Sequence, residues 1–528
     1  MVAGLFIGQH LSGSSANGGA LTVFRMRDAS AADKIGQVLE LIDRQYVDTV
    51  EKNKLVDEVL QDILQRLDPH SYYITTAELR AAQEPLEGSF EGIGVEFAIQ
   101  RDTIVVIAPV DGGPSASVGI RAGDRIISAD GKALAGVNIS NEDVMRSLRG
   151  PQGSEVKVEI LRSGRSNPFE VTIPRGTIPI HSVAVSMLDA DGTGYIKLTR
   201  FAKNTHAEFL EAAMALQEQG MRQLVLDLRG NGGGYLTSAV ELADEFLERG
   251  SVIVYTKGRN SPRRDITATS RGHLHDLRLA VLIDEGSASA SEIIAGAVQD
   301  NDRGLIVGRR SFGKGLVQEH VDLPDHSAVR LTTARYYTPS GRSIQRPYGD
   351  GIDYGQDLDD RFDHGELISI DSIRLDSSQV FTTVKGRTVY GGGGIMPDIF
   401  VPADTSEASG YLTQLFFSGA LNQFAFDVAD RDRARLMAMG SAQDFARRYE
   451  ISEQLLNELD GYARTLGIEE RPTEKEASRS QIRMRLKAGI ARNIWGNAGY
   501  YEIMLGGDRI YRRANEELAR SHAFLPGY

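Results

Sequence analysis

A strand-to-helix transition near residue 288 constrains the fold of this chain more than any other segment. The apolar run from Leu279 to Ile283 predicts a buried strand, and the small residues 286–290 interrupt it before a helical pattern begins. A hydroxyl at such a turn lies beside the unpaired backbone N–H groups of the helix N-terminus. This position suits a nucleophile whose attack creates an oxyanion, and Ser289 is the candidate.

Ser289 has a second interpretation. Ser289-Ala290-Ser291-Glu292 is also a capping box, in which the serine accepts a hydrogen bond from the third helical N–H and the glutamate reaches back to the cap. On this segment alone, a capping role and a catalytic role both remain open. The lysine and the glycines that follow favour catalysis.

Lys314 supplies a candidate general base. A serine hydroxyl is a poor nucleophile at neutral pH, and a Ser–Lys dyad needs a lysine that is desolvated enough to be neutral. Phe312, Leu316 and Val317 are apolar neighbours in sequence, and flanking glycines allow close backbone approach. Gln318 can orient the amine only if the chain turns, because four residues of straight strand span about 13 Å. The alternative for Lys314 is a solvated loop lysine.

A second glycine-rich segment, residues 230–234, follows another apolar strand. Glycines at such a place let backbone N–H groups point at an anion, either a phosphate or an oxyanion. The nucleotide-binding patterns G-x-x-x-x-G-K-[ST] and G-x-G-x-x-G do not fit the segment. We predict an oxyanion hole built from Gly232 or Gly233 together with the N–H of Ala290. The charged residues just before the glycines are predicted to form a structural ion pair: Asp227 and Arg229.

Three ordered motifs resemble the carboxyl-terminal processing proteases, also called tail-specific proteases or peptidase family S41. They are Asp227-Leu-Arg-Gly-Asn-Gly-Gly-Gly, Gly286-Ser-Ala-Ser-Ala-Ser-Glu and Phe312-Gly-Lys-Gly-Leu-Val-Gln. The resemblance implies that Ser289 is the nucleophile, that Lys314 is the general base and that Gln318 assists it. It also implies an active serine peptidase with a crotonase-like or ClpP-like α/β core.

Residues 86–176 read as a small all-β domain, because short β-branched runs alternate with Gly, Asp and Pro turns. The segment Ala122-Gly-Asp-Arg-Ile-Ile is similar to PDZ domains, in which a glycine-rich loop binds a chain carboxylate while the peptide adds as a strand. Gly92-Ile93-Gly94-Val95 occupies the position of that carboxylate-binding loop. An ordinary glycine hairpin is the alternative.

Composition narrows the function classes. At 528 residues with 41% hydrophobic residues, the chain can form several domains with cores of their own. A net charge of −13 argues against nucleic-acid binding. The absence of cysteine excludes a disulfide framework and a thiolate nucleophile. His273 and His275 have no accompanying carboxylate motif, so we predict no metal and no cofactor.

We divide the chain into five parts. They are an apolar stub with a flexible tether (1–29), an N-terminal helical region (30–85), the PDZ-like domain (86–176), the S41 peptidase core (177–403) and a helical C-terminal extension (404–528). The acidic stretch 346–394 is predicted to be a solvated loop rather than a calcium site.

Localisation is poorly encoded in the first residues. The apolar start is short and lacks a preceding basic residue, so it is not a convincing signal peptide or membrane span. Family resemblance implies a bacterial protein that is periplasmic or otherwise extracytoplasmic. A tether to the inner membrane and a homodimer both stay open.

We therefore expect a serine endopeptidase that recognises the free C-termini of protein or peptide substrates. One alternative is a non-catalytic adaptor that captures C-terminal peptides for another protease. Another is a small-molecule acyl-transfer or hydratase enzyme with the crotonase fold, which would need no PDZ-like domain.

Overall fold

The computed structural model describes residues 31–520 except residues 111, 163, 350 and 470. The predicted stub and tether lie outside the described residues. Two compact units divide between Leu67 and Asp68. The first contains two helices, α1 (Ala31–Gln45) and α2 (Lys52–Gln65), as the helical spacing of apolar residues predicts. Among the described residues, no helix combines the length and the apolar character needed to cross a bilayer.

The second unit is built around a six-stranded sheet with the order β10-β11-β12-β15-β16-β21. Only β10 runs antiparallel to its neighbour, and the other pairings are parallel. Both faces are covered, which explains the nearly continuous apolar runs of the central strands. The strands are β10 (Val183–Leu188), β11 (Thr193–Leu198), β12 (Gln223–Asp227), β15 (Arg278–Ile283), β16 (Leu305–Gly308) and β21 (Ile399–Phe400).

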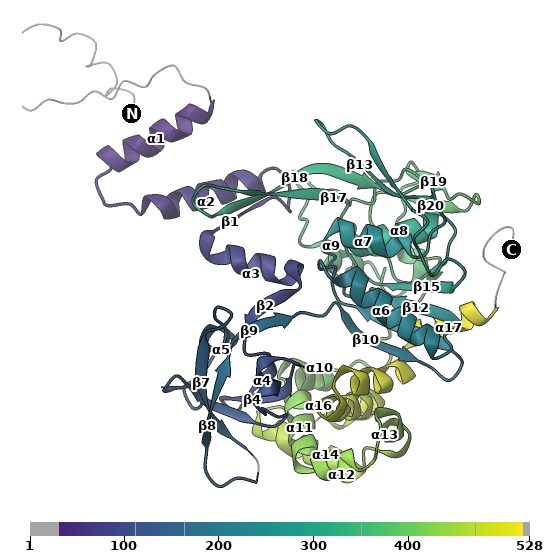
Figure 1. Cartoon of the computed structure of the whole chain (residues 1–528). Helices are drawn as coiled ribbons and strands as arrows, with labels where there is room; N and C mark the ends of the chain where they lie inside the picture. Colours follow the sequence, from purple (N-terminus) through teal and green to yellow (C-terminus); the bar gives the residue numbers. More distant parts are fainter. Residues whose placement is uncertain (1–30, 111, 163, 350, 470, 521–528) are drawn as a thin grey trace, which may run out of the picture. The chain divides into compact units, whose positions relative to one another are not determined.

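Helices from distant parts of the chain cover the two faces of this sheet. One core contains residues of α6 (Thr205–Glu218), α7 (Leu236–Asp244) and α8 (Ala290–Asp300). A second core, on residues that point the other way along β12 and β15, contains α17 (Arg509–Arg520). Figure 1 shows α17, the yellow helix, beside β12 and β15. The last helix of the chain is therefore part of the fold that carries the peptidase motifs.

The second unit also contains a five-stranded antiparallel sheet, and one of its strands carries Gln318. Its long hairpin of β17 and β18 has a register shift between Val317 and Gln318. The shift is a β-bulge, which redirects side chains locally. The strands are β1 (Tyr72–Ile74), β13 (Val252–Lys257), β14 (Arg264–Thr267), β17 (Leu316–Asp322) and β18 (Ala328–Tyr337). Helix α3 (Thr76–Glu87) follows β1 and starts with a capping box at Thr75.

The predicted all-β domain is a sheet with the order β3-β4-β5-β7-β8, and β3 lies at one edge. Burial alternates along β7, as expected for a strand with one face on a core. Helix α5 begins where predicted, because the Ser140 hydroxyl accepts the N–H of Asp143 at 3.2 Å. The main elements are β3 (Val95–Gln100), β4 (Thr103–Pro109), β5 (Arg125–Ala129), β6 (Lys132–Ala133), β7 (Glu155–Leu161), β8 (Phe169–Pro174), α4 (Pro114–Ser117) and α5 (Asn141–Leu148). The entering strand β2 (Ser89–Gly92) pairs with the leaving strand β9 (Gly176–Pro179).

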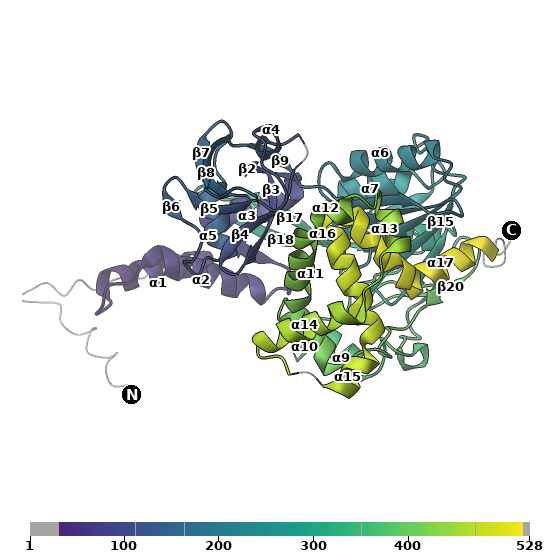
Figure 2. The ribbon, with the colours of Figure 1, turned by 90° about the horizontal axis from the view of Figure 1, so that it is seen from below.

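The C-terminal helices form a bundle with its own core. Figure 2 shows α11 and α16 packed together in this bundle. Helix α16 is interrupted at Trp495 and Gly496, where Gly496 has a φ of 62°. The helices are α10 (Gly410–Phe417), α11 (Ala420–Arg431), α12 (Arg433–Met437), α13 (Ala442–Arg448), α14 (Glu453–Thr465), α15 (Pro472–Ala477) and α16 (Arg479–Gly507).

The acidic stretch 346–394 is mostly exposed, as predicted, but it contains short elements of secondary structure. It contains α9 (Asp357–Asp363), the 3₁₀ turn η2 (Ile370–Ser372) and the hairpin of β19 (Val380–Thr382) and β20 (Thr388–Tyr390). Arg361 is 4% exposed and donates to the carbonyl of Ser311 at 2.8 Å. Arg361 and Arg346 also pair with Asp357, at 2.8 and 2.6 Å, whereas the other described aspartates of the stretch that sequence reasoning singled out are exposed, as predicted: Asp353, Asp359, Asp360 and Asp363.

Candidate active site

Ser289 lies at the turn between β15 and α8 with a φ of 55° and a ψ of −110°. This conformation costs a residue with a side chain about 1–3 kcal/mol, so its surroundings must enforce it. They do so through two neighbouring serines: Ser287 Oγ donates to the carbonyl of Leu228 at 2.9 Å, and Ser291 Oγ donates to the carbonyl of Asn231 at 2.8 Å. The turn that holds Ser289 is therefore fastened to the glycine-rich loop.

Glu292 joins this turn to the loop that carries Lys314. Its fully buried carboxyl accepts the N–H groups of Ser289 and Lys314 on Oε2, each at 2.8 Å. On Oε1 it accepts Ser311 Oγ at 2.5 Å and the N–H of Gly313 at 2.7 Å. Burial raises the pKa of Glu292 to about 7, against these four hydrogen bonds, which lower it. The back-bond of the predicted capping box is confirmed, but the same carboxyl also holds the lysine segment.

Tyr336 makes a second link between the two segments. Its hydroxyl lies 3.1 Å from the carbonyl oxygen of Ser289, and it also donates to the carbonyl oxygen of Lys314. The tyrosine is 1% exposed, and burial raises the pKa of its hydroxyl well above the usual value. Tyr336 on β18 and Glu292 on α8 therefore hold the same two backbone segments.

The environment of Lys314 favours the neutral amine. Burial lowers the pKa of Lys314, and the positive charge of Arg330 lowers it further. Opposing contributions come from Glu292 and Asp68, which raise it. A desolvated lysine beside a cation is the electrostatic setting in which a lysine can act as a base.

His70 is a neighbour of Lys314 to which sequence reasoning assigned no role. Its Nε2 lies 2.9 Å from the hydroxyl of Tyr354. Burial lowers the pKa of His70 to about 4, so the imidazole is neutral at neutral pH. The Asp-Pro-His-Ser sequence before β1 was the available signal, but no local pattern indicated what it would contact.

Gln318 is bound to the same segment. Its Nε2 donates to the carbonyl oxygen of His70. A β-bulge lies between Val317 and Gln318, on the strand that follows Lys314.

The glycine-rich loop lies directly against the Ser289 turn. A Cβ on Gly233 would lie 2.8 Å from Ser289 Cβ and 2.9 Å from the nitrogen of Ala290, so only glycine fits there. The N–H of Gly233 donates to Asn231 Oδ1 at 2.9 Å, and the carbonyl of Asn231 accepts the N–H of Ala288 at 3.0 Å. The structure thus brings the two predicted parts of the oxyanion hole to one place.

The predicted Asp227–Arg229 ion pair is confirmed, with 2.5 Å between Arg229 Nη2 and Asp227 Oδ2. Lys197 Nζ lies 3.1 Å from Asp227 Oδ1, and the Tyr195 hydroxyl donates to Oδ2 at 2.7 Å. Although burial favours the neutral acid, Arg229 and Lys197 hold the pKa of Asp227 well below its usual range. This cluster fixes the end of β12, from which the glycine-rich loop departs.

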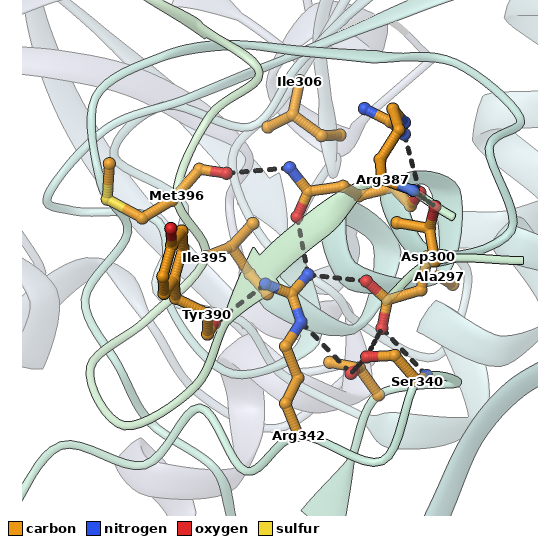
Figure 3. Close-up of polar contacts among 12 residues, drawn as sticks. Ala297, Asp300, Ile306, Ser340, Arg342, Arg387, Tyr390, Ile395 and Met396 are labelled. Atoms are coloured by element: carbon orange, nitrogen blue, oxygen red, sulfur yellow. Dashed lines mark hydrogen bonds and ion pairs between the residues drawn. The ribbon is translucent and has the colours of Figure 1, made fainter. Parts of the chain in front are cut away.

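The far end of α8 is held by a buried ion pair, shown in Figure 3. Arg342 and Asp300 are both fully buried, with 2.7 Å between Arg342 Nη2 and Asp300 Oδ1. The same guanidinium donates to Gln299 Oε1 at 2.6 Å and to the carbonyl of Tyr390 at 3.0 Å. Asp300 Oδ2 accepts the Ser340 hydroxyl at 2.7 Å. The helix that begins at the Ser289 turn is therefore anchored at both ends.

The predicted carboxylate loop, Gly92-Ile93-Gly94-Val95, lies between β2 and the edge strand β3. Ile93 is 2% exposed, and its carbonyl accepts the N–H and the hydroxyl of Ser115 at 3.0 and 2.6 Å. Gly94 has a φ of 73°, and its carbonyl accepts the N–H of Val110 at 3.0 Å. The loop is held by backbone interactions and leads into a strand at a sheet edge.

Family comparisons agree with this architecture. Residues 192–354 match the family described as Peptidase family S41, and residues 92–173 match a PDZ domain. Residues 411–496 match a family of unknown function. The fold and the matched families define a serine-type peptidase with an attached PDZ domain.

The chain belongs to peptidase family S41, the carboxy-terminal processing proteases. It is 37% identical over 317 residues to the carboxy-terminal-processing protease of Bartonella bacilliformis, covering 59% of this chain and 72% of that protein. It is 35% identical over 319 residues to the carboxy-terminal processing protease CtpB of Bacillus subtilis, covering 60% and 66%.

Two solved structures are also similar. The photosystem II D1 C-terminal processing protease is 28% identical, with 72% of this chain and 95% of that chain covered and a TM-score of 0.37. The peptide-bound PDZ domain of the Vibrio cholerae carboxy-terminal protease is 36% identical, with 17% and 97% covered and a TM-score of 0.16.

Proposed function

We propose that the chain is an endopeptidase in which Ser289 attacks the scissile carbonyl and neutral Lys314 takes the hydroxyl proton. The observation that carries this proposal is the double clamp of Glu292 and Tyr336 on both segments, combined with the lowered pKa of Lys314. Attack gives a tetrahedral intermediate, and protonated Lys314 then gives its proton to the leaving nitrogen. The C–N bond breaks, the C-terminal fragment departs as an amine and the acyl-enzyme remains beside a neutral lysine. Water then hydrolyses the ester, with the same lysine as base.

The oxyanion that forms during attack would accept hydrogen bonds from the N–H groups of Gly232 and Ala290. Gly232 is favoured over Gly233, because the N–H of Gly233 already donates to Asn231 Oδ1. Donors of this kind act on the charge that develops in the transition state. Gln318 would position the lysine loop through its bond to the His70 segment.

Substrate recognition would use the PDZ domain. The free carboxylate of a protein or peptide would bind at Gly92-Ile93-Gly94-Val95, and the chain would add as a strand beside the edge strand β3, whose Glu96 pairs with Arg492 of α16. An extended segment further upstream would then reach Ser289.

The two relatives described above are bacterial proteins. A periplasmic or otherwise extracytoplasmic location, a tether to the inner membrane and a homodimer remain proposals, testable by cell fractionation and by light scattering of the purified protein.

Two active-site variants test the chemistry. Ser289→Ala and Lys314→Ala should each abolish cleavage of an unfolded protein with a free C-terminus, while Lys203→Ala, at an exposed lysine, should leave cleavage unchanged. Thermal melts should show that all three variants fold. Comparable turnover by either active-site variant would show that the dyad is misassigned.

A second experiment separates the protease from the alternatives. Mass spectrometry of products made by the purified protein should reveal new termini, which an adaptor cannot generate. Amidation of the substrate C-terminus should slow cleavage, because it removes the carboxylate that the PDZ domain would bind. An enzyme for small molecules would be indifferent to that modification.

A further inference from the structure

The junction between α16 and α17 touches the strand end from which the glycine-rich loop departs. Asp508 Oδ2 lies 2.7 Å from Arg229 Nη2. The other oxygen, Oδ1, accepts the N–H groups of Ile510 at 2.9 Å and Tyr511 at 3.0 Å. One carboxylate therefore caps α17 and, at the same time, pairs with the arginine of the Asp-Leu-Arg-Gly motif.

Arg229 connects this carboxylate to the loop. Its side chain binds Asp227 through Nε at 3.0 Å and Nη2 at 2.5 Å, and its own N–H donates to Asp227 Oδ1 at 2.9 Å. Its carbonyl accepts Lys197 Nζ, and the next N–H, of Gly230, donates to Asp284 Oδ1 at 2.8 Å. The last residue before the glycines is thus fixed through side chain and backbone.

Helix α17 gives Asp508 a rigid support. The apolar face of α17 packs on residues of the central sheet, among them Val225 on β12 and Leu282 on β15. The hydroxyl of Tyr511 donates to Asp189 Oδ2 at 3.0 Å. A group held by a packed helix can fix its partner's position better than one on a loop. The residues of α17 that belong to this core are Ile510, Tyr511, Ala514 and Leu518.

We propose that Asp508 is a positioning residue for catalysis: through Arg229 it holds the end of β12 so that the glycine-rich loop presents its N–H donor to the oxyanion. This inference rests on the proposed function in one respect, that the loop supplies such a donor. It gives the C-terminal segment a role in the chemistry. Because the donor acts in the transition state, loss of Asp508 lowers kcat and leaves KM unchanged.

The variant Asp508→Asn tests this role, because asparagine keeps an oxygen that caps α17 and loses the charge that pairs with Arg229. Asp404→Asn is a matched control. Asp404 Oδ1 accepts the N–H of Ser406 at 3.1 Å, and Oδ2 lies 3.4 Å from Arg509 Nη1 at the start of the same helix. Both changes remove one carboxylate that combines a turn contact with an ion pair to an arginine.

The measurement is the stopped-flow rate of acylation by a p-nitrophenyl ester. Since misplacement of about 1 Å can cost roughly 100-fold, Asp508→Asn should acylate at least about tenfold more slowly, with KM and burst amplitude within about twofold of wild type. Asp404→Asn should stay within about twofold of wild type. The acidic limb of the pH–rate profile, which belongs to the lysine, should not move. Wild-type acylation by Asp508→Asn, or an equal loss in Asp404→Asn, would overturn the inference.

Amide hydrogen exchange of residues 230–234 provides a measurement that does not depend on enzymatic activity. Asp508→Asn should exchange faster there than wild type and Asp404→Asn, and equal exchange would overturn the inference. If wild-type protein forms no acyl-enzyme, the proposed function fails, while exchange still decides whether Asp508 holds the loop. If Asp508→Asn does not fold, Asp508→Glu takes its place. Its longer side chain keeps the charge but displaces Arg229, so it too should acylate more slowly and exchange faster at residues 230–234 than wild type. Wild-type values of both would overturn the inference.

Discussion

The charges around the catalytic segments and the charges that attach the PDZ domain to the C-terminal helices differ in burial. Glu292 and the Asp300–Arg342 pair are fully buried. The PDZ domain meets α11 and α16 through pairs near the surface: Arg101–Asp427 at 2.7 Å, Arg125–Asp430 at 3.3 Å and Arg492–Glu96 at 2.8 Å. In the last pair the side chains are 49% and 50% exposed.

This difference in burial indicates which part of the molecule is held rigidly. Removing one partner of a buried pair leaves an uncompensated charge and costs about 3–5 kcal/mol, whereas exposed pairs contribute about 0–1 kcal/mol each. The geometry around Ser289 is therefore fixed by interactions that are costly to break. The contacts between the PDZ domain and the helices can yield at small cost, which suits the proposed binding of a peptide by this domain.

The largest effect is expected for Arg342→Met. The change leaves Asp300 buried without its cation and should lower the free energy of unfolding by about 3–5 kcal/mol. Urea unfolding measures it. The double variant Arg342→Met, Asp300→Leu should recover much of that loss, because no unpaired charge remains. A single variant as stable as wild type would show that burial of this pair does not fix the end of α8.

Glu292→Gln should have the next largest effect, on kcat. The amide NH₂ would face one of the N–H groups that the carboxyl now accepts, which loosens the Ser289 turn or the Lys314 loop. Above the carboxyl's pKa of about 7, where Glu292 is charged, loss of such hydrogen bonds costs about 1.5–3 kcal/mol, and the same loss in the transition state would lower kcat roughly 10- to 150-fold. Glu285→Gln is the matched control, because Glu285 lies in the same turn and pairs with Arg309 at 2.8 Å. An equal fall in kcat in both variants would show that Glu292 has no specific role in holding the Ser289 turn and the Lys314 loop.

Arg330→Gln changes the charge beside Lys314 and should alter the dependence of activity on pH. The charge of Arg330 is second to burial in lowering the pKa of Lys314, so its removal lets that pKa rise. A higher pKa leaves less neutral amine at a given pH, and the acidic limb of kcat/KM should move to higher pH by up to about one unit. Arg335→Gln, on the same strand, should leave the limb in place. A shift to lower pH would contradict the assignment of Lys314 as base.

The sequence predicted the segments that carry the site because each depends on local chemistry. Small residues after a buried strand indicated the turn at Ser289, and glycines after β12 indicated the loop now found against it. Alternating short strands indicated the PDZ domain, which the matched family supports. These features need only neighbours along the chain, so a linear pattern can express them.

Contacts between distant segments could not be predicted in this way. Nothing near Arg229 indicates Asp508 as a partner, and nothing near Asp300 indicates Arg342. The same holds within the mostly exposed acidic stretch, where Glu366 is 6% exposed because it pairs with Arg310. Burial of a charge depends on a partner that only the tertiary fold supplies.

The smallest effect on stability is expected at the exposed ion pairs between the PDZ domain and the C-terminal helices. Arg101→Ala together with Arg492→Ala should lower the free energy of unfolding by less than about 1 kcal/mol per pair. The contacts should also weaken in salt, since the screening length falls from about 10 Å at 0.1 M to about 3 Å at 1 M. Hydrogen exchange of α11 should therefore rise in wild-type protein as salt is added and show little further change in the double variant. If the variant instead lost as much stability as Arg342→Met, the PDZ domain would be as rigidly held as the catalytic segments, and peptide docking would have to occur without any yielding of this interface.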